Sequence, residues 1–224
     1  MHKNIAILQS ERSHAMAAVT PIVFVVDDDI SVRDSLELLI TDAGWHPELC
    51  ASAQEFLDRP RPSCPSCLIL DVTLPDLNGL ELQKRLADRT EMPIIFITGC
   101  GDIPMSVRAM KGGAVEFLTK PTSPAILLSA IEAALDRSRT VLAEQLRLDA
   151  LRSRYRSLSP REREVMTLVV CGQLNKQAGG QLGIAEITVK AHRGRMMRKM
   201  GARSLPELVT LASRLGLETA GDHG

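Results

Sequence analysis

The stretch that decides the fold is PIVFVVDDDI (residues 21–30), in which five apolar residues run directly into three aspartates. A continuous, β-branched apolar run of this length is typical of a strand buried on both faces of a parallel sheet. The aspartates end the predicted strand, and the residues that follow predict a helix over 31–44. The stretch therefore indicates a buried strand, an acidic strand end and a helix that returns across the sheet.

The same pattern of strand and helix recurs through residues 21–137, which predicts one domain. Further strands are expected at 46–50, 67–70, 93–97 and 115–118, and helices from the end of a turn at 74–79 to about 90, at 103–111 and from Ser123 onward. Ser52 and Glu55 have the spacing of a capping box that begins another helix. Five such units in about 120 residues predict an α/β fold, a doubly wound five-stranded parallel sheet of the flavodoxin-like kind with right-handed crossovers.

Chemically active residues follow the predicted strands, and they are Asp27, Asp28, Asp71, Thr98 and Lys120. A single aspartate there is more often a helix cap than a ligand, but five such residues at the ends of four strands are hard to explain as caps. The carboxyl ends of parallel strands meet at one sheet edge, where three carboxylates would repel one another unless a cation joined them. A divalent ion such as Mg²⁺ suits such a site, and one carboxylate could then attack phosphorus.

The charges are segregated along the chain, although the formal net charge is zero. Residues 21–140 hold 11 basic and 18 acidic side chains, whereas residues 141–224 hold 14 basic and 8 acidic ones. The basic part predicts four short helices at about 160–171, 175–182, 186–200 and 204–215, the first opened by a Ser159–Glu162 capping box. A short helix, a turn at Gly183 and a longer basic helix indicate a helix-turn-helix, and the basic charge suggests a polyanionic partner.

The remaining segments complete the predicted organisation. Residues 138–156 lack proline and glycine and are expected to form a helical linker, and residues 1–20 to be a disordered extension. No apolar run is long enough to span a bilayer, and five cysteines without an export signal favour a reducing, cytoplasmic location. Cys64 and Cys67 have CxxC spacing, but without a second pair or nearby histidines we assign them no redox or zinc role.

Residues 22–121 resemble the receiver domain of two-component response regulators, through VVDDD, LILDVTLPDLNGLEL, PIIFITG and DIPMSVRAMKGGAVEFLTKP. Residues 157–213 resemble the LuxR-type helix-turn-helix, through SLSPREREVM, LNK, LGI and ITVKAHRGRMMRKMGARSLPELV. Together they resemble NarL/FixJ-type transcriptional regulators, and most of all the FixJ and NodW branch of nodulation and nitrogen fixation. The resemblance implies a receiver at 21–137, the linker, and a DNA-binding domain at 157–224.

The resemblance implies a regulator that is phosphorylated by a sensor histidine kinase, rather than an enzyme. Asp71 would accept the phosphoryl group, and Thr98 and Lys120 would contact its oxygens. Asp28, Asp71 and the backbone carbonyl of Thr73 would hold Mg²⁺, with Asp27 assisting through water. Phe117 would be the aromatic switch whose rotamer follows Thr98. The FixJ branch usually has histidine at Cys100 and an aromatic residue at Thr122, so these two departures concern the strength of switching or the lifetime of the phosphate, and not the identity of the acceptor.

The second helix of the helix-turn-helix is expected to lie in the major groove of double-stranded promoter DNA. Lys190 is the best candidate for a base-edge contact, with Ala191 and Gly194 on the same face. The predicted phosphate contacts are Lys176, Thr188, Arg193 and Arg198, although the arginines could simply form a solvated face. Gly179 and Gly180 are expected to weaken the first helix of the motif. The implied protein would dimerise on phosphorylation, contact RNA polymerase and activate transcription.

The same residues leave open an alternative function, that of an enzyme. Asp27-x-Asp29-x-Ser31, Thr98 and Lys120 also imitate the motifs of a haloacid-dehalogenase-like phosphatase, in which Asp27 would be the nucleophile. That family also needs an acidic pair on a strand after the lysine, whereas the next acids, Glu132 and Asp136, fall in a predicted helix. A receiver-like module used only for dimerisation is disfavoured by the complete acidic cluster.

Overall fold

The computed structural model describes residues 20–99 and 101–217. The chain forms two compact units, which divide within one long helix between Ala143 and Glu144. The predicted disordered extension, apart from Thr20, lies outside the described residues.

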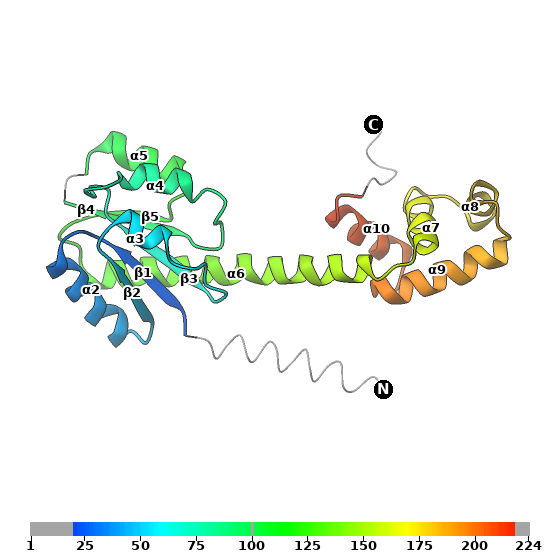
Figure 1. The fold of residues 1–224 in the computed structure, drawn as a ribbon, viewed down its shortest axis with the longest axis horizontal. Helices are drawn as coiled ribbons and strands as arrows, with labels where there is room; N and C mark the ends of the chain where they lie inside the picture. The colour runs from blue at the N-terminus through cyan, green and yellow to red at the C-terminus, as the bar shows by residue number, and fades with distance from the viewer. Residues whose placement is uncertain (1–19, 100, 218–224) are drawn as a thin grey trace. The chain divides into compact units, whose positions relative to one another are not determined.

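The first unit is a five-stranded parallel sheet with helices on both faces (Figure 1). Its elements are β1 (Ile22–Val26), α2 (Ile30–Asp42), β2 (His46–Cys50), α3 (Ala53–Leu57), β3 (Ser66–Leu70), α4 (Gly79–Arg85), β4 (Ile94–Thr98), α5 (Ile103–Lys111), β5 (Glu116–Thr119) and the start of α6 (Pro124–Arg156). The strand order is β2-β1-β3-β4-β5, with every pairing parallel, so β3 is the central strand. The predicted doubly wound α/β fold is confirmed.

The apolar run in β1 is continuous because both faces of the sheet are covered. Phe24 and Val26 pack into one hydrophobic cluster with residues of α3, α4 and α5. Val23 and Val25 point the other way, into a cluster with residues of α2 and α6. Alternate residues of a strand face opposite sides of the sheet, so a doubly covered strand needs apolar residues at every position.

Several element bounds differ from the prediction for local reasons. The helix α4 ends at Arg85 rather than near Thr90, because the chain then passes through tight turns in which Arg89 N–H bonds the Leu86 carbonyl. The strands β3, β4 and β5 are each displaced by one residue from the predicted ranges at one or both ends. Ser52 caps α3 as expected, but Glu55 accepts from the N–H of Ala51 instead of closing a capping box on Ser52.

The second unit is helical. It contains the end of α6, then α7 (Pro160–Val170), α8 (Asn175–Leu182), α9 (Glu186–Met200) and α10 (Leu205–Arg214). The predicted Ser159–Glu162 capping box opens α7. One core joins the four short helices to the end of α6, and it includes Leu151, Val165, Met166, Val189, Met196, Met200 and Leu208. The helix-turn-helix is α8, a left-handed turn at Gly183, and α9.

The two glycines of α8 have different roles, which corrects the expectation that both merely weaken it. Gly179 is buried, and a Cβ there would lie 2.8 Å from the carbonyl oxygen of Ile184 in the turn between α8 and α9. Gly180 is exposed, and a Cβ there would meet nothing within 4 Å. Gly179 therefore permits the close approach of α8 to the turn, whereas only Gly180 costs helix stability without a compensating contact.

We expect Gly179→Ala and Gly180→Ala to change stability in opposite directions. Gly179→Ala should destabilise the helical unit by about 1–3 kcal/mol, because backbone must move to admit the methyl group. Gly180→Ala should stabilise it by up to about 1 kcal/mol through helix propensity. Guanidinium unfolding of the full chain measures both, with emission from Tyr155, the single tyrosine, reporting this unit. A stabilising effect of both variants would contradict the close approach at Gly179.

Candidate functional site

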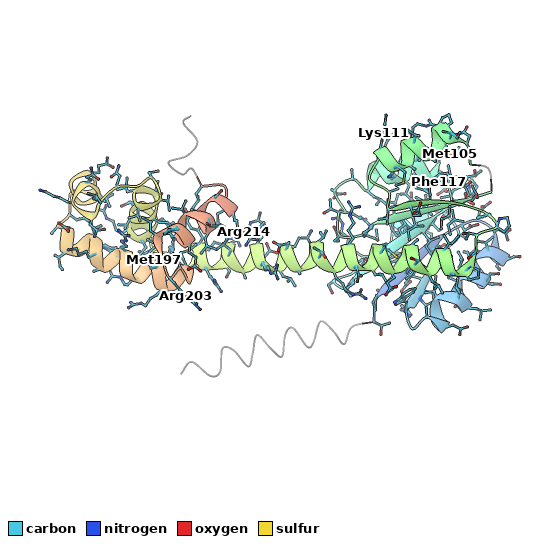
Figure 2. The ribbon with its side chains drawn as sticks, turned by 180° about the vertical axis from the view of Figure 1, so that it is seen from behind. Met105, Lys111, Phe117, Met197, Arg203 and Arg214 are labelled. Carbon is cyan, nitrogen blue, oxygen red and sulfur yellow. The ribbon has the colours of Figure 1, made fainter. Side chains whose placement is uncertain are left out.

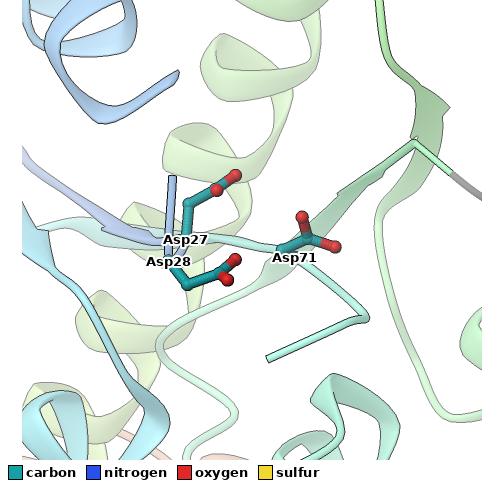
Figure 3. Close-up of side chains that lie close together, drawn as sticks. All are labelled: Asp27, Asp28 and Asp71. Carbon is teal, nitrogen blue, oxygen red and sulfur yellow. The ribbon is translucent and has the colours of Figure 1, made fainter. Parts of the chain in front are cut away.

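Three carboxylates meet at the edge of the sheet where the strands end (Figure 3). Asp27 and Asp28 follow β1, and Asp71 follows the central strand β3. One oxygen of each lies within 4.8 Å of the others. Asp27 and Asp71 are buried, whereas Asp28 is exposed. The parallel sheet thus brings together the acids that the sequence separates by more than forty residues.

Backbone contacts hold these acids in place. Asp71 donates its N–H to the carbonyl of Val26, 2.9 Å away, which joins the ends of β1 and β3. Its Oδ1 accepts the N–H of Thr73 at 2.9 Å. Arg33, which the sequence reasoning missed, donates from α2 to the carbonyl oxygen of Asp27 at 2.6 Å. The acidic edge is therefore preformed by hydrogen bonds that involve β1, α2 and the segment after β3.

Lys120 is the cation of the site. Its Nζ lies 2.6 Å from Oδ2 of Asp27 and 2.6 Å from Oδ2 of Asp71. Burial disfavours the ammonium, but its hydrogen bonds to the two carboxylates outweigh burial and raise the pKa of Lys120. The backbone N–H of Lys120 donates to the carbonyl of Thr98 at 2.8 Å, which places it beside β4, and the Lys120–Pro121 bond is cis.

The donor set fits a hard divalent cation. Three carboxylates face a single ammonium, so one further positive charge would reduce their repulsion. Burial, more than any other influence, raises the pKa of Asp27, and the negative charge of Asp71 acts in the same direction. Oxygen ligands of this kind are those that Mg²⁺ prefers. Asp27, Asp28 and Asp71 are therefore placed as a cluster that could hold such an ion.

The predicted switch residues lie beside the acidic edge. Thr98 is the last residue of β4 and is 1% exposed, and Phe117 is half-buried on the neighbouring β5. A Cβ on Gly101 would come within 2.9 Å of the Phe117 ring and 3.3 Å of the Thr98 methyl, so both side chains border the same small space. Phe117 and Met105 of α5 pack on the same hydrophobic cluster (Figure 2). Cys100 lies outside the described residues, and Thr122 is half-buried.

Gly79 is a residue of this site that sequence reasoning did not single out beyond its turn. It is buried at the first position of α4, and its N–H donates to the carbonyl of Val72 at 2.9 Å. A Cβ there would lie only 2.4 Å from the backbone oxygen of Asp71. The glycine therefore lets α4 approach the backbone that carries the acceptor candidate.

We expect Gly79→Ala to destabilise the first unit by about 1–3 kcal/mol, because a Cβ at this place must displace the backbone of Asp71. The same displacement should weaken Mg²⁺ binding. Urea unfolding followed by Trp45, the single tryptophan, measures the first effect, and calorimetric titration with Mg²⁺ measures the second. Gly99→Ala is the matched control, because a Cβ there would meet nothing within 4 Å. Equal stability of the two variants would show that the approach at Gly79 is unimportant.

The predicted DNA-contacting residues lie on α8 and α9 in the second unit. Lys176, Lys190, Ala191, Gly194 and Arg198 are exposed, and Thr188 is half-buried. Lys190 lies 3.1 Å from Glu186 of its own helix. Arg193 differs from the others, because it is half-buried and donates to Oδ1 of Asn175 at 3.0 Å, which ties α9 to the start of α8.

The buried acid Glu162 contacts basic residues of α9, whereas the sequence predicted only its capping role. Glu162 of α7 is 3% exposed and accepts the N–H of Ser159. It also accepts from Nζ of Lys199 at 2.7 Å and lies 3.5 Å from Nε of Arg195. These hydrogen bonds, that from Lys199 first, hold the pKa of Glu162 below its usual range. Glu162 thus links the start of α7 to the basic helix α9.

A parallel sheet with an acidic edge facing a lysine, followed by a helix-turn-helix unit, defines the DNA-binding response regulators. Residues 23–132 match the family described as "Response regulator receiver domain", and residues 156–212 match "Bacterial regulatory proteins, luxR family". The chain belongs to the two-component response regulators that carry a LuxR-type DNA-binding domain, in agreement with the predicted resemblance.

Several relatives match over most of their own length. The chain is 49% identical over 210 residues to "Nodulation protein W" of Bradyrhizobium diazoefficiens, which covers 93% of this chain and 92% of the relative. It is 44% identical to "Response regulator protein TodT" of Pseudomonas putida, over 87% of this chain and 86% of the relative. Among solved structures, "Low Resolution Structure of Response Regulator StyR" matches with 46% identity and a TM-score of 0.77, over 88% of this chain and all of that one.

These matches give no support to the phosphatase alternative. The structure also places Glu132 and Asp136 in the helix α6, so the described part of the first unit has no acidic pair on a strand after Lys120.

Among the described residues, no helix is long and apolar enough to cross a membrane.

Proposed function

We propose that Asp71 accepts a phosphoryl group from a phosphohistidine of a sensor histidine kinase. The observation that carries the proposal is the placement of its carboxylate at the end of the central strand, beside Asp27 and Asp28 and 2.6 Å from the Lys120 ammonium. An oxygen of Asp71 would attack phosphorus, the phosphorus–nitrogen bond would break with its electron pair going to nitrogen, and the released imidazole would take up a proton from water. The chain would act in this relay as acceptor and regulator, without turnover of a separate substrate.

The remaining residues of the edge would stabilise the transferred group. Asp28, Asp71 and the backbone carbonyl of Thr73 would hold Mg²⁺, with Asp27 assisting through water, and the ion would neutralise phosphoryl charge. Lys120 donates hydrogen bonds to Asp27 and Asp71 in the structure. After phosphorylation it would keep its bond to Asp27 and donate another hydrogen bond to a phosphoryl oxygen. The Thr98 hydroxyl would donate to a second oxygen, and the ring of Phe117 would follow into the space beside Gly101.

The second unit would bind double-stranded promoter DNA through α9. Lys190 would reach base edges with Ala191 and Gly194 beside it, and Lys176, Thr188 and Arg198 would contact phosphates. Arg193 would reach phosphate only by giving up its bond to Asn175. We further propose a receiver at 21–137, a linker at 138–156 and a DNA-binding domain at 157–224. Phosphorylation would favour a homodimer in the cytoplasm, and this dimer would activate transcription through RNA polymerase. The chain would belong to the same branch of the family as its nodulation relative.

Selection of DNA sites from a random duplex library tests the proposal. The full chain with Mg²⁺ should enrich a two-fold symmetric site, and acetyl phosphate should tighten binding to that site at a fixed salt concentration. Footprinting on the enriched site then locates the two half-sites. Binding of all sequences with equal affinity, with and without acetyl phosphate, would contradict a sequence-specific regulator.

A further inference from the structure

One large apolar side chain lies where a soluble helix normally carries a polar one. Ile187, in the first turn of α9, is 73% exposed. The buried residues of α9 are Val189, Met196 and Met200, and at 3.6 residues per turn Ile187 lies about half a turn around the helix from Val189 and Met196. Ile187 therefore lies on the outward face of α9, opposite its buried residues.

Two further residues continue this apolar line along the helix. Ala191 and Gly194 follow Ile187 at spacings of four and three residues, which keeps all three on one face, and both are exposed. Gly194 is in the interior of the helix, where glycine costs about 1 kcal/mol relative to alanine, yet a Cβ there would meet nothing within 4 Å. Nothing in the described chain requires a glycine at this position. A missing side chain at Gly194 and a large one at Ile187 suit an external surface that approaches the helix closely.

The charges around this line indicate what that surface is. α9 carries five basic residues, Lys190, Arg193, Arg195, Arg198 and Lys199, against one acid, Glu186. Arg198 lies on the same outward face, and Lys190 flanks it. An apolar strip bordered by cations matches the major groove, where phosphates line both sides and the thymine C5-methyl is the apolar group displayed between them. The early residues of such a helix are those that reach base edges.

We propose that Ile187 is a specificity-determining residue that packs against the C5-methyl group of a thymine in each half-site. The inference rests on the proposed DNA-reading role of α9 and adds to it a contact through apolar packing, distinct from the hydrogen bonding of Lys190. Ile187 selects thymine over cytosine and over any pyrimidine without the methyl group at one position. Ala191 and Gly194 leave the room that lets the helix approach that base.

The test compares thymine with deoxyuridine, which lacks only the C5-methyl group and keeps every hydrogen-bonding group. Duplexes of the selected site are made with deoxyuridine at one thymine position of each half-site at a time, and the full chain is titrated by fluorescence anisotropy at fixed salt. For the unaltered protein, replacement at one position should weaken binding about fourfold per half-site, the effect expected for about one buried methyl group. Replacement at the other positions should change little.

Two variants assign the effect to the side chain. Ile187→Ala should bind thymine and deoxyuridine duplexes equally at that position, whereas Ile187→Val should keep part of the discrimination. Leu174→Ala is the matched control, because Leu174 is 69% exposed in the same unit but lies outside α9, and it should keep full discrimination. Circular dichroism confirms that each variant is folded.

If no thymine methyl matters to the unaltered protein, or if Ile187→Ala keeps the same thymine-to-deoxyuridine ratio, the inference is overturned while the proposed function stands. If Ile187→Ala changes only the oligomeric state, the strip is a protein contact and the inference is again overturned. Failure to enrich any DNA site would overturn the proposed sequence-specific function together with this inference.

Discussion

Asp71→Asn should abolish covalent phosphorylation by acetyl phosphate, because an amide oxygen cannot serve as the anionic nucleophile. The variant should remain folded, since Oδ1 can still accept the N–H of Thr73 and Lys120 keeps its bond to Asp27. Intact-protein mass spectrometry should show an added phosphoryl group on the unaltered chain and none on the variant. Trp45 emission checks that the first unit is folded.

Two further variants make this result specific. Asp34→Asn alters an exposed acid on α2 that is not part of the cluster of Asp27, Asp28 and Asp71, and it should leave phosphorylation unchanged. Asp27→Asn should slow phosphorylation, because it removes one carboxylate from the proposed Mg²⁺ site, but it should not abolish it. Persistent phosphorylation of Asp71→Asn with complete loss in Asp27→Asn would identify Asp27 as the nucleophile and contradict our proposal.

Glu162→Ala should destabilise the second unit by about 2–4 kcal/mol, the largest stability effect we expect. The change removes the cap on the Ser159 N–H and leaves Lys199 and Arg195 without the acid that links them to α7. Lys199 is partly exposed and can regain water, so the loss should stay below that of a fully buried pair. Guanidinium unfolding followed by Tyr155 emission measures the change.

The pH dependence separates the charge of Glu162 from its packing. The folded-state pKa of Glu162 is lowered, so its contribution is fully present above its unfolded pKa of about 4.3 and is lost as pH falls through the folded value. The Glu162→Gln variant should therefore have a lower free energy of unfolding than the unaltered chain at pH 7. The difference between the two should become smaller at lower pH. Glu164→Gln, on the exposed side of α7, is the control and should change stability little. An unchanged difference at pH 7 and pH 3 would contradict a role for the charge.

The sequence by itself determined the order of elements and the places where strands end. An apolar run such as Ile22–Val26 and a cap such as Ser159 act over a few neighbouring residues, so their pattern is legible without the fold. The rule that parallel strands end at one edge then brought Asp27, Asp71 and Lys120 together in prediction. The matching families confirm the class of protein that this pattern indicated.

Only the tertiary structure decided which atoms are in contact and which side chains are exposed to solvent. The bond between Lys120 and Asp27 joins residues 93 positions apart and depends on the pairing of Thr98 with Thr119 across β4 and β5. The close approaches at Gly79 and Gly179 depend on the angle at which a helix packs, which no local pattern encodes. Whether an isoleucine of α9 faces the core or the outside depends in the same way on how that helix is rotated against its neighbours, and that rotation leaves Ile187 exposed.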